Sequence, residues 1–243
     1  MPLLDVDGVS VRFGGHLALS DVHVPVIEGT ITGLIGPNGA GKTTLFNVIS
    51  GLQPPSGGDV RFDGVSLLGL TPAKRARAGL ARTFQRLELF TSLTVRENIQ
   101  VAGEIRNRWS IRRRAGIDVI GETERIIDLL GLQAVAEREV AEIPTGQARV
   151  VELGRALMTR PRLLLLDEPA SGQDDHETQQ FGALLRRLNG DGMTILLVEH
   201  DMSLVMSVCD HVHVLDFGSI IASGTTHEVQ ADPRVLDAYL GAS

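Results

Sequence analysis

The chain has 243 residues, of which 43% are apolar and 22% charged, and this balance excludes disorder as its dominant state. Its formal net charge of −7 disfavours a general nucleic-acid-coating role, so we expect no nucleic-acid partner. The single cysteine, Cys209, excludes an intrachain disulfide and any multi-cysteine metal site. We expect it to behave as a small buried apolar residue.

No stretch of the sequence approaches the roughly 20 consecutive apolar residues that span a bilayer. Met1 to Asp5 lack the basic flank and apolar run of a secretory signal. We therefore expect a cytoplasmic chain that reaches a membrane only through a partner. A cluster of arginines around Trp109 predicts a solvated helical face, with proximity to anionic lipid headgroups as the alternative: Arg106, Arg108, Arg112, Arg113 and Arg114.

The first 30 residues are expected to form strands, because apolar and polar residues alternate around Val9–Phe13 and Val22–Val26. A short apolar strand, Ile31–Ile35, then runs into a glycine-rich segment. A helix is predicted from Lys42 to about Ser50, where Gly51 stops it.

The rest of the chain changes from helical to alternating elements. After a strand at Asp59–Phe62, Thr71-Pro72 predicts a helix start, Ala81–Gln85 is short and extended, and residues 94–142 are rich in helix. Beyond Arg160 we expect, in order, a strand, a helix, a strand, a helix and a strand: Leu163–Leu166, about Glu177–Leu188, Thr194–Val198, about Ser203–Cys209 and Val212–Leu215. Such alternation predicts an α/β fold with a parallel sheet, into which the helical stretch is inserted.

A phosphate-binding loop is predicted by the pattern G-x-x-x-x-G-K-[ST], which occurs as Gly36-Pro37-Asn38-Gly39-Ala40-Gly41-Lys42-Thr43. Its glycines let the backbone curl so that successive N–H groups face a phosphate, and the following helix adds its positive end. Lys42 supplies a charge for the β and γ phosphates, Thr43 offers a hydroxyl to Mg²⁺, and Thr44 completes the nucleotide-binding set. The alternative, a glycine-rich turn without a ligand, is disfavoured by the strand before it and the helix after it.

Two carboxylates follow the leucine strand, Asp167 and Glu168. Ligands bind at the carboxyl ends of strands in an open α/β sheet, so we expect Asp167 to face the metal that Thr43 binds, through water. Glu168 is then placed to polarise a water molecule that attacks the γ phosphate. The alternative is a strand end that merely meets solvent, and the phosphate loop in the same chain favours the catalytic interpretation.

Four further segments complete a pattern that resembles the ATP-binding subunits of ABC transporters: Arg82-Thr83-Phe84-Gln85, Ile143–Gln147, Ser171–Asp174 and Val198–Asp201. The resemblance covers essentially the whole chain. It implies a P-loop NTPase fold, with a RecA-like parallel core, an antiparallel β subdomain and an α-helical subdomain inserted at about residues 86–145. All of these belong to one nucleotide-binding domain, residues 1–243, with a helical tail at about 227–243.

The resemblance also implies roles for residues around the chain's own ATP. Gln85 is the glutamine-loop residue, which senses Mg²⁺ and the attacking water, and its loop faces the membrane subunit. His200 is the switch histidine at the γ phosphate, and Phe13 stacks on adenine. Taken alone, a histidine at a strand end is usually structural or solvated, and a lone aromatic is usually core.

Other residues are implied to serve the ATP of a second subunit. The signature loop, Thr145, Gly146 and Gln147, contacts the γ phosphate held by the opposite subunit, and Asp174 lies in the loop that crosses to it. Pro144 stands where the family usually has serine, which removes a hydroxyl and a backbone donor. We expect ATP binding and pairing to survive and turnover to be slower; the alternative is that this position tolerates variation.

Two parts of the sequence are similar to branched-chain amino-acid importers. The first is the glutamine loop followed by Leu89-Phe90 and Leu93–Asn98, and the second is the tail, Ile221–Thr225 with Ala231–Gly241. Asp232-Pro233 opens a short helix with an apolar stripe that is expected to dock on its own domain: Val235, Leu236, Tyr239 and Leu240. The resemblance implies ATP hydrolysis that powers an importer, with a second nucleotide-binding subunit, like or unlike, transmembrane permease subunits and, indirectly, a substrate-binding protein. It places the chain peripherally on the inner face of the cell membrane.

Three alternatives remain open on the sequence. Importers of urea, short amides or other amino acids share this tail. A nucleotide-binding regulator with weak turnover is suggested only by Pro144. A soluble ABC-type factor of DNA repair or translation would usually carry two such domains or a long coiled-coil insert, and neither is visible.

Overall fold

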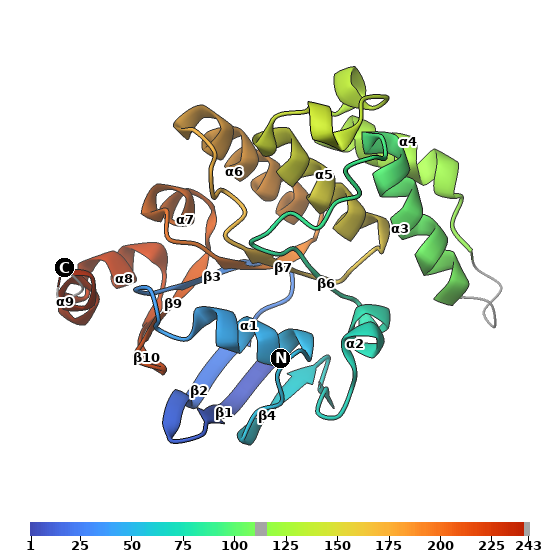
Figure 1. Ribbon diagram of the computed structural model, residues 1–243. Helices are drawn as coiled ribbons and strands as arrows, with labels where there is room; N and C mark the ends of the chain where they lie inside the picture. Colours follow the sequence, from blue (N-terminus) through green and yellow to red (C-terminus); the bar gives the residue numbers. More distant parts are fainter. Residues whose placement is uncertain (110–115, 241–243) are drawn as a thin grey trace.

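The computed structural model describes residues 1–109 and 116–240, folded as two sheets with helices between and above them (Figure 1). Arg112, Arg113 and Arg114 of the arginine cluster, and Gly241 of the tail, lie outside the described residues, as does the side chain of Leu240. The strands are β1 (Leu4–Phe13), β2 (His16–Val26), β3 (Ile31–Ile35), β4 (Gly57–Phe62), β5 (Val65–Ser66), β6 (Leu80–Arg82), β7 (Leu163–Asp167), β8 (Thr194–Val198), β9 (His211–Asp216) and β10 (Ser219–Gly224). The helices are α1 (Lys42–Ser50), α2 (Pro72–Ala78), α3 (Val95–Trp109), α4 (Val119–Leu130), α5 (Thr145–Met158), α6 (Asp175–Gly190), α7 (Met202–Val208), α8 (Thr226–Ala231) and α9 (Pro233–Leu240), with short 3₁₀ turns at Gln133–Val135 and Val140–Glu142.

The larger sheet has the order β10-β9-β3-β8-β7-β6, with parallel pairing from β9 to β6 and an antiparallel edge at β10. Its central strands are apolar throughout because both faces are covered. In β7, Leu164 and Leu166 pack with the helices above, whereas Leu163 and Leu165 pack with α1 and the second sheet below. The four-leucine run is therefore buried on both faces, and its end delivers Asp167 to the edge of the sheet.

The smaller sheet is antiparallel, in the order β2-β1-β4-β5, and α1 lies between it and the larger sheet (Figure 1). The valines predicted to alternate in the first two strands point into this layer; Val9, Val11, Val22 and Val24 are fully buried. Phe46 and Ile49 of α1 are equally buried and fill the space between the sheets. The phosphate loop thus leads into a helix, α1, that packs against the larger sheet on one side and the smaller sheet on the other.

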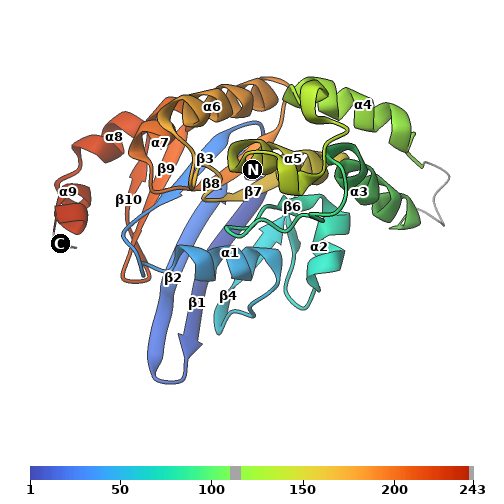
Figure 2. The same ribbon diagram turned by 45° about the horizontal axis from the view of Figure 1, so that its top comes forward.

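A helical layer of α3, α4 and α5 lies beside α6 above the larger sheet, as Figure 2 shows. Gly154 of α5 allows close packing, since a Cβ there would come within 3.0 to 3.3 Å of Leu130, Ile99 and Ile126. Within the described residues, no helix combines the length and the apolarity needed to cross a bilayer.

Most predicted elements are confirmed. The helix Lys42–Ser50 and the strand Thr194–Val198 have the predicted bounds, and Gly51 caps α1 with a φ of 83°. Cys209 is 4% exposed, and burial raises the pKa of its thiol to about 12. The prediction that the tail stripe docks on its own domain was wrong for one residue. Val235 is buried, but Leu236 is 51% exposed, because α9 packs on β10 and α8 along only part of its surface.

Candidate functional site

The phosphate loop leaves β3 in a conformation that requires glycine. Gly36 has a φ of 149°, and a Cβ on it would lie 2.0 Å from the carbonyl oxygen of Leu215 in β9. Gly39 and Gly41 also have positive φ values, 82° and 110°. Neighbouring backbones therefore approach the loop closely, and within the loop the Ala40 amide donates to the Pro37 carbonyl at 3.2 Å. Thr43, in the first turn of α1, is exposed.

The Lys42 side chain is buried, with 7% of the residue exposed, and its ammonium binds the loop itself. Nζ donates to the carbonyl oxygens of Gly36 at 2.6 Å and Pro37 at 3.0 Å. Burial lowers the pKa of this ammonium, and the nearby carboxylates of Glu168 and Asp167 oppose that shift. The phosphate loop and the two carboxylates thus lie in one electrostatic site, although about 125 residues separate them in the chain.

Asp167 is held by an arginine that sequence reasoning did not single out. Arg82 of β6 donates from Nη2 to Asp167 Oδ2 at 2.8 Å, and both side chains are at least 93% buried. The Nη1 of Arg82 donates at 2.8 Å each to Asn47 and Ser50 of α1. Since α1 begins at the phosphate loop, this guanidinium ties the loop's helix to the carboxylate. Asp167 Oδ1 accepts no hydrogen bond from the described residues.

Glu168 and Gln85 meet directly. Glu168 has a φ of 48°, an uncommon conformation for a residue with a side chain, and its amide donates to Val198 at 2.9 Å. Gln85 Nε2 donates to Glu168 Oε2 at 2.8 Å. The structure therefore brings the predicted catalytic carboxylate and the glutamine-loop residue into contact.

His200 is exposed and follows a buried carboxylate, Glu199, which sequence reasoning also missed. Glu199 is 0% exposed and accepts from the amides of Ala170 at 2.9 Å, His200 at 3.0 Å and Asp201 at 3.3 Å. Burial raises the pKa of this carboxyl, and the three amides oppose the shift. Glu199 connects the segment after Glu168 to the segment that carries His200.

The signature loop opens α5, with Pro144 as an N-cap that provides no side-chain hydrogen bond. Thr145 and Gln147 are exposed, whereas Gly146 is buried against α6. A Cβ on Gly146 would lie 2.6 Å from Glu177 Oε1. Glu177 and Asp174 form the capping box of α6. This close approach explains why residue 146 is glycine. It also brings the signature loop and the Asp174 segment together.

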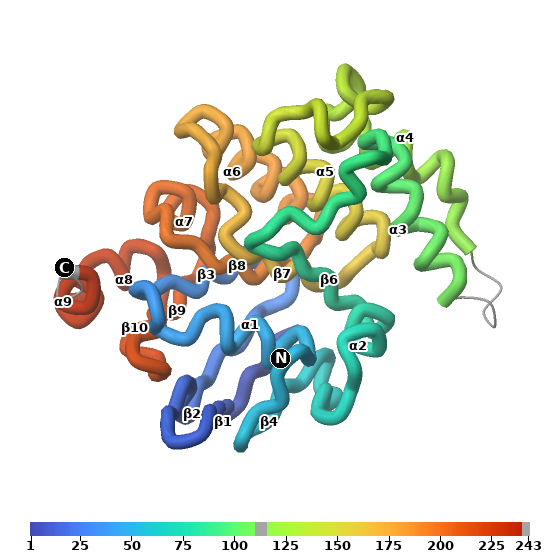
Figure 3. The backbone as a smooth tube through the Cα atoms, viewed as in Figure 1, coloured from blue at the N-terminus to red at the C-terminus, as the bar shows by residue number. Residues whose placement is uncertain are grey.

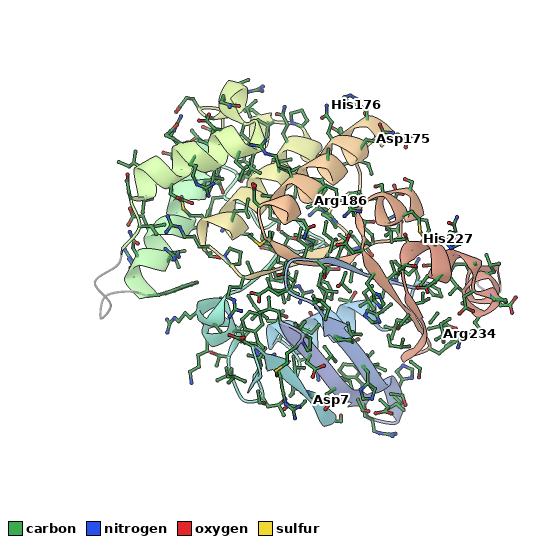
Figure 4. The ribbon with its side chains drawn as sticks, turned by 180° about the vertical axis from the view of Figure 1, so that it is seen from behind. Asp7, Asp175, His176, Arg186, His227 and Arg234 are labelled. Carbon is green, nitrogen blue, oxygen red and sulfur yellow. The ribbon has the colours of Figure 1, made fainter. Side chains whose placement is uncertain are left out.

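The phosphate-loop residues and the signature-loop residues lie in different parts of the structure. In Figure 1 the start of α5 lies in the upper part of the molecule, apart from the start of α1, and among the described residues no hydrogen bond joins Thr145–Gln147 to the phosphate loop. In Figure 4, Asp175 and His176 at the start of α6 point outward from the edge of the molecule. Phe13, at the end of β1, is 49% exposed, so the core alternative for it was wrong.

The sequence profile of the ABC transporter family matches residues 19–171, and that of the branched-chain amino acid ATP-binding cassette transporter matches residues 219–243. The chain therefore belongs to the ABC transporter family.

Named relatives and solved structures span nearly the whole chain. It is 40% identical to the high-affinity branched-chain amino acid transport ATP-binding protein BraF of Pseudomonas aeruginosa, over 99% of this chain and 98% of that protein. It is 38% identical to LivG of Escherichia coli K12, a high-affinity branched-chain amino acid transport ATP-binding protein, with the same coverage. A nucleotide-free ATP-binding cassette from an ABC transporter superposes with a TM-score of 0.87 at 31% identity, over 98% of this chain and 99% of that one. The ADP conformation of an ABC transporter cassette gives 0.88 at 32% identity, over 99% of both chains. The predicted α/β P-loop NTPase fold is confirmed.

Proposed function

We propose that this chain is the ATP-binding and ATP-hydrolysing subunit of an ABC importer for branched-chain or other amino acids. The observation that carries the chemistry is the Arg82 guanidinium, which joins α1, the helix that begins at the phosphate loop, to Asp167 at the end of β7. The family membership and the names of BraF and LivG support the transport role and the substrate class. The match of residues 219–243 to a branched-chain cassette profile favours amino acids over urea or short amides.

ATP binds along the phosphate loop. Its anionic oxygens replace the Gly36 and Pro37 carbonyls as partners of Lys42, and a charged acceptor is the stronger one. The amides of Asn38, Gly39 and Ala40, together with Thr44, complete the cradle. Phe13, half exposed at the end of β1, supplies a face for adenine to stack on.

Hydrolysis depends on the carboxylates and on Gln85. Thr43, Asp167 and Gln85 would hold Mg²⁺ through the oxygen donors that it prefers, and Asp167 Oδ1, which accepts no hydrogen bond from the described residues, fits such a role. When bound, Mg²⁺ neutralises charge on the phosphate oxygens. Glu168 orients the attacking water and takes its proton, Gln85 holds that carboxylate in place, and His200 contacts the γ phosphate.

The complete site needs two chains, head to tail. Thr145, Gly146 and Gln147 of one subunit close on the ATP held by the other, with Asp174 crossing at the same edge. Separation of the two half-sites within the described residues supports this arrangement. We propose one domain over residues 1–243, with a helical subdomain at about 86–145 and a tail at about 227–243.

A groove beside the glutamine loop is the proposed docking site for a permease subunit. A cavity of about 330 Å³ opens there between α2, α3 and α5, lined mainly by apolar groups that include Leu52, Ala76, Phe84, Ile105 and Trp109. Phe84 precedes Gln85, so a permease segment in this groove sits one residue from the hydrolytic site. With a permease bound there, the chain lies peripherally on the inner face of the membrane, and a substrate-binding protein lies on the far side of the permease.

Phosphate release from ATP by the purified chain, with and without its permease, tests the proposal. Glu168→Gln should lower turnover about 10²- to 10⁴-fold, the usual contribution of a positioned general base, while ATP binding survives and the closed pair accumulates. Recovery of a polytopic permease by pull-down from detergent-solubilised membranes tests the transport role. Undiminished turnover in Glu168→Gln contradicts the assignment of the base, and a pull-down without a permease contradicts the transport role.

A further inference from the structure

The segment after Gln85 runs along one charged face of α5. Figure 3 shows the chain between β6 and α3 crossing α5, and Figure 2 shows the same course from another side. Arg149, Glu152 and Arg155 are spaced three residues apart, which aligns them on the α5 face toward this segment. A charged stripe on a helix usually faces water. Here Arg149 and Glu152 are each only 8% exposed at the side chain.

These side chains bind the main chain of the glutamine loop. Arg149 Nη1 donates to the carbonyl oxygen of Phe84 at 2.8 Å, and its Nη2 donates to that of Gln85. Glu152 Oε1 accepts the amide of Phe84 at 3.3 Å, and its Oε2 pairs with Arg149 at 3.3 Å. The backbone of Phe84 is therefore held on both sides, and that of Gln85 at its carbonyl.

Arg155 extends the same contact. It donates to the carbonyl oxygen of Glu88, and its guanidinium lies 5.0 Å above the ring centre of Phe90. The stripe fixes where the loop backbone runs, while the side chain of Gln85 stays exposed and reaches Glu168. At its other end the loop is held by the Arg82–Asp167 ion pair.

We propose that Arg149 and Glu152 are positioning residues that hold Gln85 against Glu168 and join it rigidly to the signature helix; the inference rests on the proposed function. Arg149 lies four residues after Thr145, about one turn into α5. A displacement of the signature end, which serves the partner's ATP, therefore moves the backbone of Gln85 at this chain's own ATP. The stripe links the two nucleotide sites of the pair.

A double-mutant cycle tests the link, with kcat and KM of the assembled transporter as the readout. Arg149→Gln and Glu152→Gln should each lower kcat about tenfold, the rate equivalent of one lost hydrogen bond, with little change in KM. In a Gln85→Ala background the same substitutions should change kcat less than twofold, because they act only through Gln85. An equal loss in both backgrounds overturns the proposal, since it indicates general damage to the fold.

Glu122→Gln is the matched control. Glu122 lies in the same helical layer, has the same 8% side-chain exposure and pairs with Arg125 at 2.7 Å and Arg160 at 3.0 Å, but does not touch residues 84–90. It should lower stability about as much as Glu152→Gln while leaving kcat unchanged. A kcat loss as large as that of Glu152→Gln also overturns the proposal.

Amide hydrogen exchange separates this inference from the proposed function, since it needs no turnover. Without nucleotide, residues 84–90 should exchange at least tenfold faster in Glu152→Gln than in Glu122→Gln. Equal exchange in the two variants overturns the positioning contact. A wild-type chain that releases no phosphate from ATP, yet shows this exchange difference, refutes the function and leaves the contact standing.

Discussion

His213 should make the stability of the protein fall as the pH drops below neutrality. This residue of β9 is 2% exposed, and its Nδ1 lies 2.7 Å from Ser223 Oγ in β10. Burial, and secondarily the neighbouring His211, lower the pKa of His213 from 6.5 to about 4. The imidazole therefore stays neutral in the folded protein over a range in which the unfolded chain takes up a proton.

The sign and size follow from proton linkage. Above pH 6.5 both states hold neutral His213, and its contribution to stability is complete. Between pH 6.5 and 4 only the unfolded state is protonated, so the free energy of unfolding falls, by about 2 kcal/mol at pH 5 and about 3 kcal/mol below pH 4.

Urea denaturation at pH 7.5 and pH 5 measures this loss. Because carboxylates also titrate near pH 5, the informative quantity is the difference between the wild type and His213→Gln, which should have a pH-dependent loss smaller by about 2 kcal/mol. His227→Gln, in exposed α8 at the edge of the molecule (Figure 4), is the control and should behave as the wild type. Equal losses in the wild type and His213→Gln would refute the reasoning.

Three further changes probe the nucleotide site. Lys42→Ala should weaken ATP binding about 10- to 150-fold through the loss of one charge-assisted hydrogen bond, and calorimetry showing unchanged affinity contradicts that role. Gly36→Ala should cost about 1–3 kcal/mol of unfolding free energy in thermal melts, because its Cβ meets the Leu215 carbonyl at 2.0 Å. Gly39→Ala, with nothing within 4 Å of its Cβ, should cost less, and the reverse order would be inconsistent with the clash. Pro144→Ser should raise phosphate release up to about tenfold if the missing hydroxyl limits turnover, and an unchanged rate supports a tolerant position.

Local signals predicted the elements that local forces determine. The helix Lys42–Ser50 has its predicted bounds because a glycine-rich loop precedes it and Gly51 adopts the left-handed conformation that ends it. The leucine strand was recognised because a strand covered on both faces needs continuous apolar residues. In both cases the signal lies in residues that are adjacent in the sequence.

The strand β10 was missed for an equally local reason. Phe217 and Gly218 form a two-residue turn between β9 and β10, and both have positive φ values, 40° and 79°. Such turns usually carry Asn-Gly or Asp-Gly, whereas phenylalanine rarely adopts this conformation, so the sequence carries no ordinary hairpin signal.

The residues that support the site could not be predicted because their partners are distant in the chain. Many of these partners are backbone groups, which every residue type carries. Arg82 pairs with a residue 85 positions away, and Arg149 binds main-chain oxygens 64 and 65 positions away. A hydrogen bond to a main-chain carbonyl does not constrain the type of the residue that supplies the carbonyl, so the sequence carries no signal for it. Glu199 is similar, since it binds only backbone amides of Ala170, His200 and Asp201.

In the proposed head-to-tail pair, a lone chain supplies a phosphate cradle at one edge and a signature helix at another, so it holds no complete reaction centre. At low concentration the ATPase rate of the purified subunit should rise with the square of its concentration. Dilution should abolish this activity before the chain unfolds. Glu168→Gln chains mixed with wild-type chains should then lower the ATPase rate, because they form pairs with wild-type chains and contribute no turnover of their own.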